Sequence, residues 1–196
     1  KTNNQKGSVR IDGSYLKLPK IGWVKLIQHR AIKGNIKSVT ISKTASNKYY
    51  ASILCEVDIQ PLPKTGNAVG IDLGLVDFTI LSTGEKIGNP HLGKKAAKKL
   101  TKAQKVLSRR YLQAKAMSKP LAEAKNYQKQ RLKVARLHER IYHQRQDFLH
   151  KVSTEIIKNH DVICIEDLAT KNLVRNHRLA KAISDVAWSE FVRMLE

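Results

Sequence analysis

Two short apolar segments, each carrying a carboxylate, constrain the fold of this chain more than any other feature. The first runs from Val69 to Gly74 and contains Asp72, and the second runs from Val162 to Leu168 and contains Glu166. Short apolar runs of this kind are typical of buried strands. Because a carboxylate on such a strand is costly to bury, we predict that a cation compensates both charges.

The chain between these two segments has helical composition. Residues 94 to 159 are rich in Ala, Leu, Lys and Gln, and Pro120 divides them into predicted helices of about residues 94 to 117 and 121 to 159. The second helix has an apolar stripe that we expect to pack on a sheet, formed by Val134, Leu137, Ile141, Phe148, Val152 and Ile156.

The order of the remaining elements predicts the fold class. Residues 68 to 72 and 78 to 81 have the pattern of a strand pair, and residues 172 to 177 form a polar connection to an amphipathic helix over 179 to 194. A strand pair, long helices, a strand and a helix make a mixed α/β domain. The order fits a ribonuclease H-like sheet with a long inserted helical hairpin.

The first third of the chain has a different texture. Strand signals fill residues 8 to 57, including a hairpin of residues 38 to 42 and 49 to 54, which indicates a small, basic, antiparallel β module. The prolines and glycine between Pro61 and Asn67 cannot continue a sheet interior. We therefore place a domain boundary near residue 65, with one domain over residues 1 to 64 and the other over 65 to 196.

The formal net charge of +21 is unevenly distributed. Residues 94 to 151 hold 18 Lys and Arg against 3 Asp and Glu, whereas residues 70 to 93 hold 1 against 3 and residues 152 to 196 hold 6 against 7. An enzyme that grips a phosphate backbone and binds metal locally needs this pattern. Ribosomal proteins are equally basic, however, so total charge alone does not distinguish an enzyme from a scaffold.

The basic residues of the helical stretch are the candidates for phosphate binding. A solvated helical hairpin explains their exposure without any ligand, and contact with nucleic acid is an added function. The candidates are Lys98, Lys102, Lys105, Arg109, Arg110, Arg131, Arg136, Arg140 and Arg145.

Cys55 and Cys164 are the two cysteines, and each lies in an apolar run. We predict that both fill the core rather than form a disulfide or bind a metal. Free thiols favour a reducing compartment, and no apolar run is long enough to cross a membrane. The expected location is the cytoplasm of a prokaryote, in association with the nucleoid.

The two strand carboxylates suit phosphodiester cleavage assisted by metal ions. Asp72 is the candidate bridging ligand because a strand holds its short side chain in place, and Glu166 is its candidate partner. Oxygen ligands favour Mg²⁺, with Mn²⁺ as a substitute. Asp167 competes with Glu166, since neighbouring strand residues face opposite ways. Asp77 and Asp185 are weaker candidates, which a strand end and a helix start explain without metal.

Four separated segments of the chain resemble the TnpB family, also called OrfB. They are residues 70 to 74, 144 to 151, 165 to 168 and 176 to 185, and the resemblance extends over essentially the whole chain. These transposon-encoded proteins are relatives of the type V CRISPR nucleases. The resemblance implies that residues 1 to 64 are the last part of a β-barrel wedge domain and that residues 65 to 196 belong to a RuvC-like nuclease domain.

This resemblance also implies a function and a catalytic set. TnpB proteins are RNA-guided DNA endonucleases, so a transposon-derived guide RNA and a DNA target are the expected partners. Asp72 matches the acid of the first RuvC motif and Glu166 that of the second. The third motif and the zinc module with paired Cys-x-x-Cys have no counterpart here, so we expect a fragment that lacks the third acid and is inactive alone, with Zn²⁺ only in the missing part.

Two alternatives stay open at this point. The segment from Gly70 to Gly74 also resembles the first phosphate motif of actin-like and Hsp70-like ATPases, although Leu75 and Val76 follow it instead of hydroxyl residues. The other alternative is a nucleic-acid-binding chain without catalytic activity.

Overall fold

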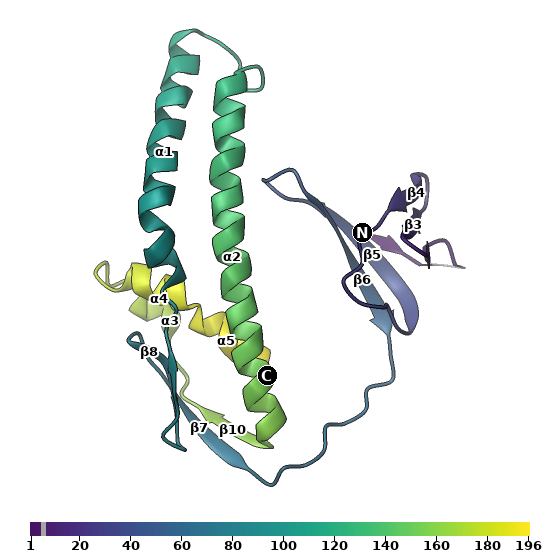
Figure 1. The fold of residues 1–196 in the computed structure, drawn as a ribbon, viewed down its shortest axis with the longest axis vertical. Helices are drawn as coiled ribbons and strands as arrows, with labels where there is room; N and C mark the ends of the chain where they lie inside the picture. Colours follow the sequence, from purple (N-terminus) through teal and green to yellow (C-terminus); the bar gives the residue numbers. More distant parts are fainter. Residues whose placement is uncertain (5–6) are drawn as a thin grey trace. The chain divides into compact units, whose positions relative to one another are not determined.

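The computed structural model describes residues 1–4 and 7–196. The chain divides into two compact units, Lys1–Pro61 and Leu62–Glu196 (Figure 1). The division falls at the first proline of the segment that the sequence marks as a linker. Each unit has its own hydrophobic core.

The first unit is built from antiparallel strands. They pair in two three-stranded sheets, ordered β1-β5-β6 and β2-β3-β4, where the strands are β1 (Thr2–Asn3), β2 (Arg10–Asp12), β3 (Tyr15–Leu18), β4 (Gly22–Lys25), β5 (Asn35–Lys43) and β6 (Tyr49–Glu56). Val9, Leu16, Leu18 and Val39 form the shared core of these sheets. The long β5–β6 pair confirms the predicted hairpin. The strands of the described residues thus form two small sheets on one core, and their assignment to part of a β-barrel, which the resemblance implies, stays a prediction.

The second unit contains a mixed four-stranded sheet of order β10-β7-β8-β9. Its strands are β7 (Ala68–Leu73), β8 (Asp77–Leu81), β9 (Lys86–Gly88) and β10 (Val162–Ile165). Strand β10 runs parallel to β7, and the other pairs are antiparallel. The predicted strand pair and the later strand are confirmed, and β9 is an addition that the sequence did not indicate.

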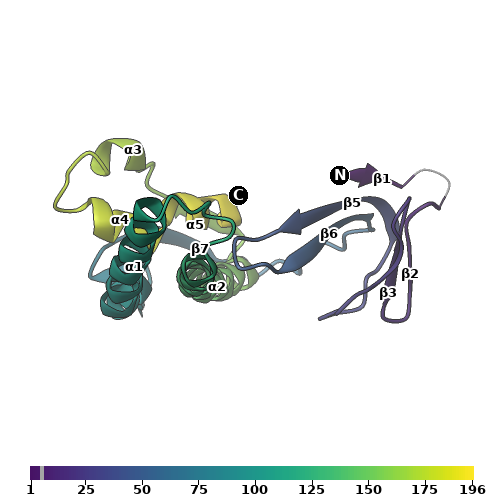
Figure 2. The same ribbon diagram turned by 90° about the horizontal axis from the view of Figure 1, so that it is seen from above.

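Five helices complete the second unit: α1 (Leu92–Ala116), α2 (Lys125–Asn159), α3 (Thr170–Leu173), α4 (Ala180–Val186) and α5 (Trp188–Leu195). Helices α1 and α2 lie side by side as a hairpin inserted between β9 and β10 (Figures 1 and 2). Between them, the buried amide of Gln130 donates a hydrogen bond of 2.8 Å to the carbonyl of Ala103. No helix in the described part of the chain is long and apolar enough to cross a lipid bilayer.

One face of the sheet packs against α2, α4 and α5. Phe78 on β8 lies at the centre of this core, with its ring centroid 5.0 Å from that of Phe148 and 4.9 Å from that of Phe191, both in edge-to-face geometry. The predicted stripe of α2 is buried at Val134, Ile141, Val152 and Ile156, with Leu137 and Phe148 partly buried. Leu149, which the stripe omitted, is fully buried.

The prediction of one continuous helix over residues 179 to 194 was wrong, because the chain forms two helices there. Ala187 has a left-handed backbone, with φ of 55°, and separates α4 from α5. This break turns the chain so that Ile183 of α4 and Phe191 of α5 both reach the same core. In addition, the short helix α3 begins just before the predicted polar connection.

Candidate functional site

The register of β7 and β10 brings the two predicted metal ligands to the same place. Ile165 pairs with Ile71 in the parallel ladder, so Glu166 and Asp72 are the next residues on the two adjacent strands. Successive side chains of a strand point to opposite faces. Because Ile71 is buried in the core, Asp72 projects from the opposite face of the sheet.

Asp72 and Glu166 line a common hollow with a volume of 500 Å³. Its other lining residues are Gly70, Ile71, Ile80, Leu81, Ser82, Cys164 and Ile165. Both carboxylates are exposed to solvent. The prediction that these charges are buried was therefore wrong: the strands bury their alternate residues and leave the carboxylates hydrated. The case for a cation rests on the placement of two acids together, not on the cost of burial.

The prediction for Cys164, which lies on the same face of the sheet, was also wrong. The sequence predicted that it fills the core, yet it is exposed and lines the hollow of Asp72 and Glu166. The cause is its spacing of two residues from Glu166, which gives both side chains the same orientation on the strand. Cys55 is partly buried, and both thiols are free.

The other acids considered from the sequence lie elsewhere. Asp167 lines a different hollow, which Glu166 also lines but Asp72 does not, and Asp77 stands at the start of β8. Within residues 1–4 and 7–196, no group of three or more His, Cys, Asp or Glu side chains is placed to hold a metal ion. Asp72 and Glu166 thus offer two oxygen donors, a set that fits Mg²⁺, which proteins often bind through one or two carboxylates while the ion keeps water and phosphate ligands.

A tight turn fixes the strand that carries Asp72 against β8. The amide of Gly74 donates to the carbonyl of Phe78 at 3.2 Å. A Cβ atom at Gly74 would lie 2.7 Å from the backbone carbonyl oxygen of Asp77, which only glycine avoids. This close approach explains the glycine that follows the apolar strand.

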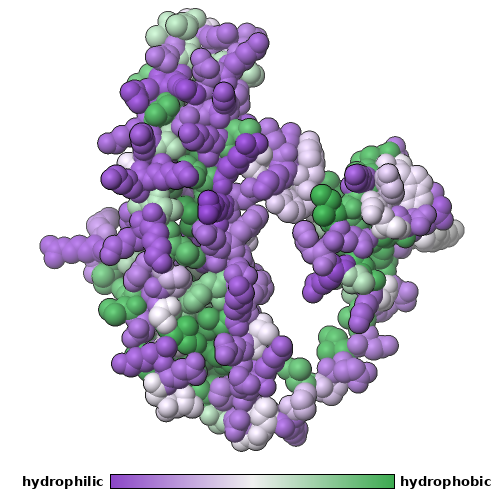
Figure 3. Space-filling model, in the orientation of Figure 1, coloured by the Kyte–Doolittle hydropathy of each residue, from purple (hydrophilic) through white to green (hydrophobic). Residues whose placement is uncertain are grey.

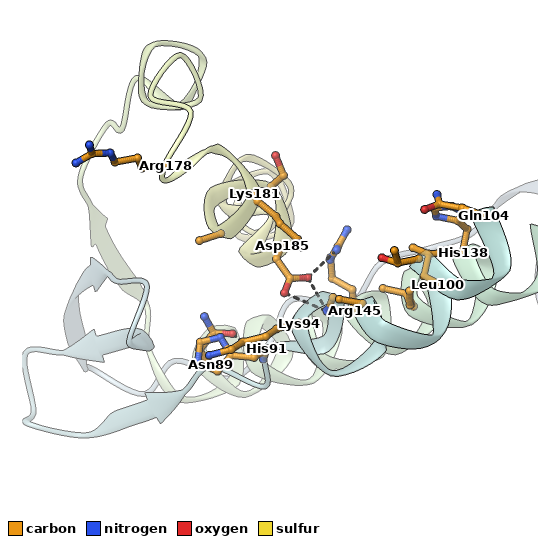
Figure 4. A pocket seen from close by; sticks show the side chains of 16 residues that line it. Asn89, His91, Lys94, Leu100, Gln104, His138, Arg145, Arg178, Lys181 and Asp185 are labelled. Atoms are coloured by element: carbon orange, nitrogen blue, oxygen red, sulfur yellow. Dashed lines mark hydrogen bonds and ion pairs between the residues drawn. The ribbon is translucent and has the colours of Figure 1, made fainter. Parts of the chain in front are cut away.

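Asp185 has a structural role that involves three helices. Its carboxylate lies on α4 and accepts hydrogen bonds of 2.9 and 3.0 Å from the amide of Gly93 in the first turn of α1 (Figure 4). It also pairs with Arg145 of α2 at 3.0 Å. The two side chains are 15% and 23% exposed. Asp185 does serve a helix start, as predicted for it, but the start belongs to α1 and not to its own helix.

Gly93 is the residue that permits this contact. Helix α1 has no acidic residue in its first turn and no side-chain cap from His91, so Asp185 from α4 provides the acceptor for the Gly93 amide. A Cβ atom at position 93 would lie only 2.5 Å from the Oδ1 atom of Asp185. One carboxylate therefore joins α1, α2 and α4.

Most of the predicted phosphate-binding residues are on the solvent side of the hairpin, where hydrophilic side chains cover most of the face seen in Figure 3. The exposed ones are Lys98, Lys102, Lys105, Arg109, Arg131, Arg136 and Arg140. Two of the nine differ. Arg110 donates a hydrogen bond of 2.8 Å to the carbonyl of Asn126, and Arg145 is held by Asp185.

Comparison with known proteins identifies the family of this chain. A family model described as "Probable transposase", OrfB_IS605, matches residues 52–177, which is more than half of the chain. The chain belongs to the TnpB/OrfB family. This membership supports the resemblance to TnpB and lends no support to the alternative of an ATPase of the actin or Hsp70 type.

Two curated relatives support this membership. A "Putative RNA-guided DNA endonuclease" from Streptomyces pristinaespiralis is 45% identical over 159 residues, which are 81% of this chain and 37% of that protein. The "Putative RNA-guided DNA endonuclease InsQ" of Escherichia coli K12 is 34% identical over 94% of this chain and 47% of its own length. The chain thus spans less than half the length of these two relatives.

Proposed function

We propose that this chain is the part of an RNA-guided DNA endonuclease that supplies two acids of a RuvC-like, metal-dependent cleavage site. The observation that carries the proposal is the parallel register of β7 and β10, which makes Asp72 and Glu166 neighbours on the uncovered face of the sheet. The mixed sheet with its inserted hairpin is compatible with a ribonuclease H-like domain.

The two carboxylates have different mechanical properties. Asp72 lies on an interior strand with partners on both sides, so its short side chain is held rigidly. Glu166 follows the last residue of the outer strand β10, and its longer side chain can adjust to reach a shared ion. A Mg²⁺ ion bound between them would activate water for attack on a phosphodiester. The open face of the sheet leaves room for a nucleic-acid backbone to approach.

The proposed partners are a DNA target and a guide RNA. The names of both relatives state RNA-guided action on DNA for those proteins. In this chain, the exposed Lys and Arg residues of the hairpin would contact phosphates without reading sequence, which base pairing with the guide would supply. A third acid from the remainder of the protein would complete the metal site.

Substitution of the acids in the full-length protein tests the proposal. Asp72→Asn and Glu166→Gln should each lower Mg²⁺-dependent cleavage of target DNA by at least about a hundredfold, because a metal site loses a charged ligand. Asp167→Asn is the matched control, since it is the adjacent acid but lies outside the hollow of Asp72. Guide RNA binding should be unchanged in all three. Cleavage retained by Asp72→Asn, or lost equally in the control, would contradict the assignment.

A further inference from the structure

The outer face of the sheet β2-β3-β4 carries aromatic and basic residues in two cross-strand rows. In one row Arg10 pairs with Lys17 and Lys17 with Trp23. In the next row Tyr15 lies between Asp12 and Lys25. Directly opposed side chains of an antiparallel pair have Cβ atoms about 5 Å apart, so each row forms a continuous strip. These six residues are referred to below as the outer face.

The core of the first unit does not require these residue types. On the same sheet the alternate residues Leu16 and Leu18 face inward and are buried, which leaves Tyr15 and Lys17 pointing outward. Trp23 is 46% exposed and Tyr15 is 50% exposed. About half of each ring is therefore open to water on the same face of the sheet, where it can contact a ligand.

Two cations lie at the ring of Trp23. The Arg10 guanidinium carbon is 5.5 Å from the ring centroid, and the Lys17 ammonium nitrogen is 5.9 Å from it. With Lys25 these residues give the outer face three cations against the single carboxylate of Asp12. An exposed aromatic ring within a cationic strip can stack a base and neutralise its phosphates at the same time.

We propose that the outer face binds an unpaired base of a single-stranded nucleic acid, with the base stacked on Trp23 and the adjoining phosphates held by Arg10, Lys17 and Lys25. Every base offers a π face, so such a site is tolerant of sequence. A duplex conceals the faces of its bases, so the site distinguishes single strands from double strands. RNA and DNA share this chemistry.

This site is independent of the proposed cleavage chemistry. It lies in the unit of residues 1–61, whereas Asp72 and Glu166 lie in the unit of residues 62–196. Stacking needs no metal ion. The loss of binding at Trp23 and the loss of cleavage at Asp72 can therefore be observed separately.

Tyr49 provides a matched control in the same unit. It is 67% exposed, and the Lys43 ammonium nitrogen lies 5.3 Å from its ring centroid. It belongs to the other sheet, β1-β5-β6, and lies outside the two rows of the outer face. Tyr49→Ala therefore also removes an exposed aromatic ring that has a cation nearby, but it leaves the proposed site intact.

The experiment uses tryptophan fluorescence and affinity together. The chain has two tryptophans, Trp23 on the outer face and Trp188, which is buried at 6% exposure. Single-stranded RNA and DNA ten-mers are titrated in separate arms, with an abasic strand of the same length and a duplex for comparison. At least one of the two ten-mers should quench the emission of Trp23, and the abasic strand and the duplex should quench it far less, because only an unpaired base can stack.

The variants separate stacking from charge. Trp23→Phe should abolish the quenching and keep most of the affinity. The retained affinity then shows that the unit still folds. Trp23→Ala should weaken binding of the quenching strand by about tenfold or more, in line with the loss of one stacked base. Tyr49→Ala should stay within about twofold of the unaltered chain. Equal quenching by the abasic strand or the duplex, quenching that survives in Trp23→Phe, or unchanged affinity in Trp23→Ala would overturn the proposal.

Discussion

At the scale of single residues, Asp185 holds the helical part of the second unit together. Its carboxylate accepts the Gly93 amide and pairs with Arg145, so one side chain connects the start of α1, the middle of α2 and the end of α4. Both charged groups are mostly withdrawn from water, which makes the loss of one partner more costly than at an exposed ion pair. The Gly93 amide in the first turn of α1 would also lose its acceptor.

We predict that Asp185→Ala lowers the free energy of unfolding by about 2 kcal/mol, the combined loss of a helix cap and a partly buried ion pair. Gly93→Ala should destabilise in the same direction, because its methyl group displaces the carboxylate. Urea denaturation followed by circular dichroism measures both. Asp147→Ala is the control: its exposed pair with Lys151 should contribute within about 0.5 kcal/mol. Equal effects of Asp185→Ala and Asp147→Ala would contradict this role.

Cys164 shows what the sequence could and could not predict at this scale. Its period of two with Glu166 was visible in the sequence, and a hydrated Glu166 requires an exposed Cys164. The apolar neighbours Ile163 and Ile165 suggested burial instead. Asp185 was beyond prediction for another reason, since its partner Gly93 lies 92 residues away in the chain and nothing local identifies the contact.

At the scale of elements, the register of β10 on β7 decides whether a metal site can form. A slip of one residue would turn Glu166 to the opposite face of the sheet. Asp161 connects the residues that precede β10 to those that precede β7. Its carboxylate accepts hydrogen bonds from the amides of Thr65 at 3.0 Å and Gly66 at 2.7 Å. The carbonyl of Asn67 in turn accepts the amide of Asp161 at 2.9 Å. Asp161 therefore joins the segments that lead into β7 and β10.

These contacts make a prediction about pH. Hydrogen bonds from the backbone of Thr65 and then Gly66 lower the pKa of Asp161 from its ordinary value of 3.8. Because the folded pKa is below the unfolded one, the stabilisation is present above about pH 3.8 and is lost as pH falls through the folded pKa. The amide resonance of Gly66 should titrate with a midpoint below 3.8 by NMR, and Asp161→Asn should remove that titration. A midpoint at or above 3.8 would contradict the contact.

The helical hairpin carries a second prediction at this scale. Lys98, Lys102 and Lys105 recur at spacings of four and three on α1 and are exposed, so they can contact successive phosphates. Replacing all three by Ala should reduce the slope of log affinity against log salt by about two to three for duplex DNA. Arg110→Ala should lower the free energy of unfolding and leave the salt slope nearly unchanged, because the Arg110 guanidinium already donates to a carbonyl of α2. An unchanged slope in the triple variant would exclude this face from binding.

The elements themselves followed largely from the sequence. The strands around Asp72 and Glu166 are short apolar runs and the two long helices have helical composition, so all four were predicted close to their observed limits. The break at Ala187 was not predicted, because Ala favours a helix by itself and only the packing of Ile183 and Phe191 on one core imposes the left-handed turn. Strand β9 is too short, at three residues, for any periodic signal.

At the scale of the whole molecule, charge is divided between a strongly basic majority of the chain and two segments with net negative charge. The chain has a formal net charge of +21, yet Asp72 and Glu166 lie in the segments with net negative charge. A polyanion can thus be attracted broadly while a cation is held at one place. The outer face around Trp23 adds a proposed contact of another kind, through a base instead of a phosphate.

Anomalous scattering from crystals soaked in Mn²⁺ shows whether Asp72 and Glu166 share a cation. One anomalous peak is expected in the hollow of these residues, coordinated by an oxygen of each carboxylate, and it should disappear in Asp72→Asn. Peaks only at other sites, or a peak in the hollow that persists in Asp72→Asn, would contradict a shared cation.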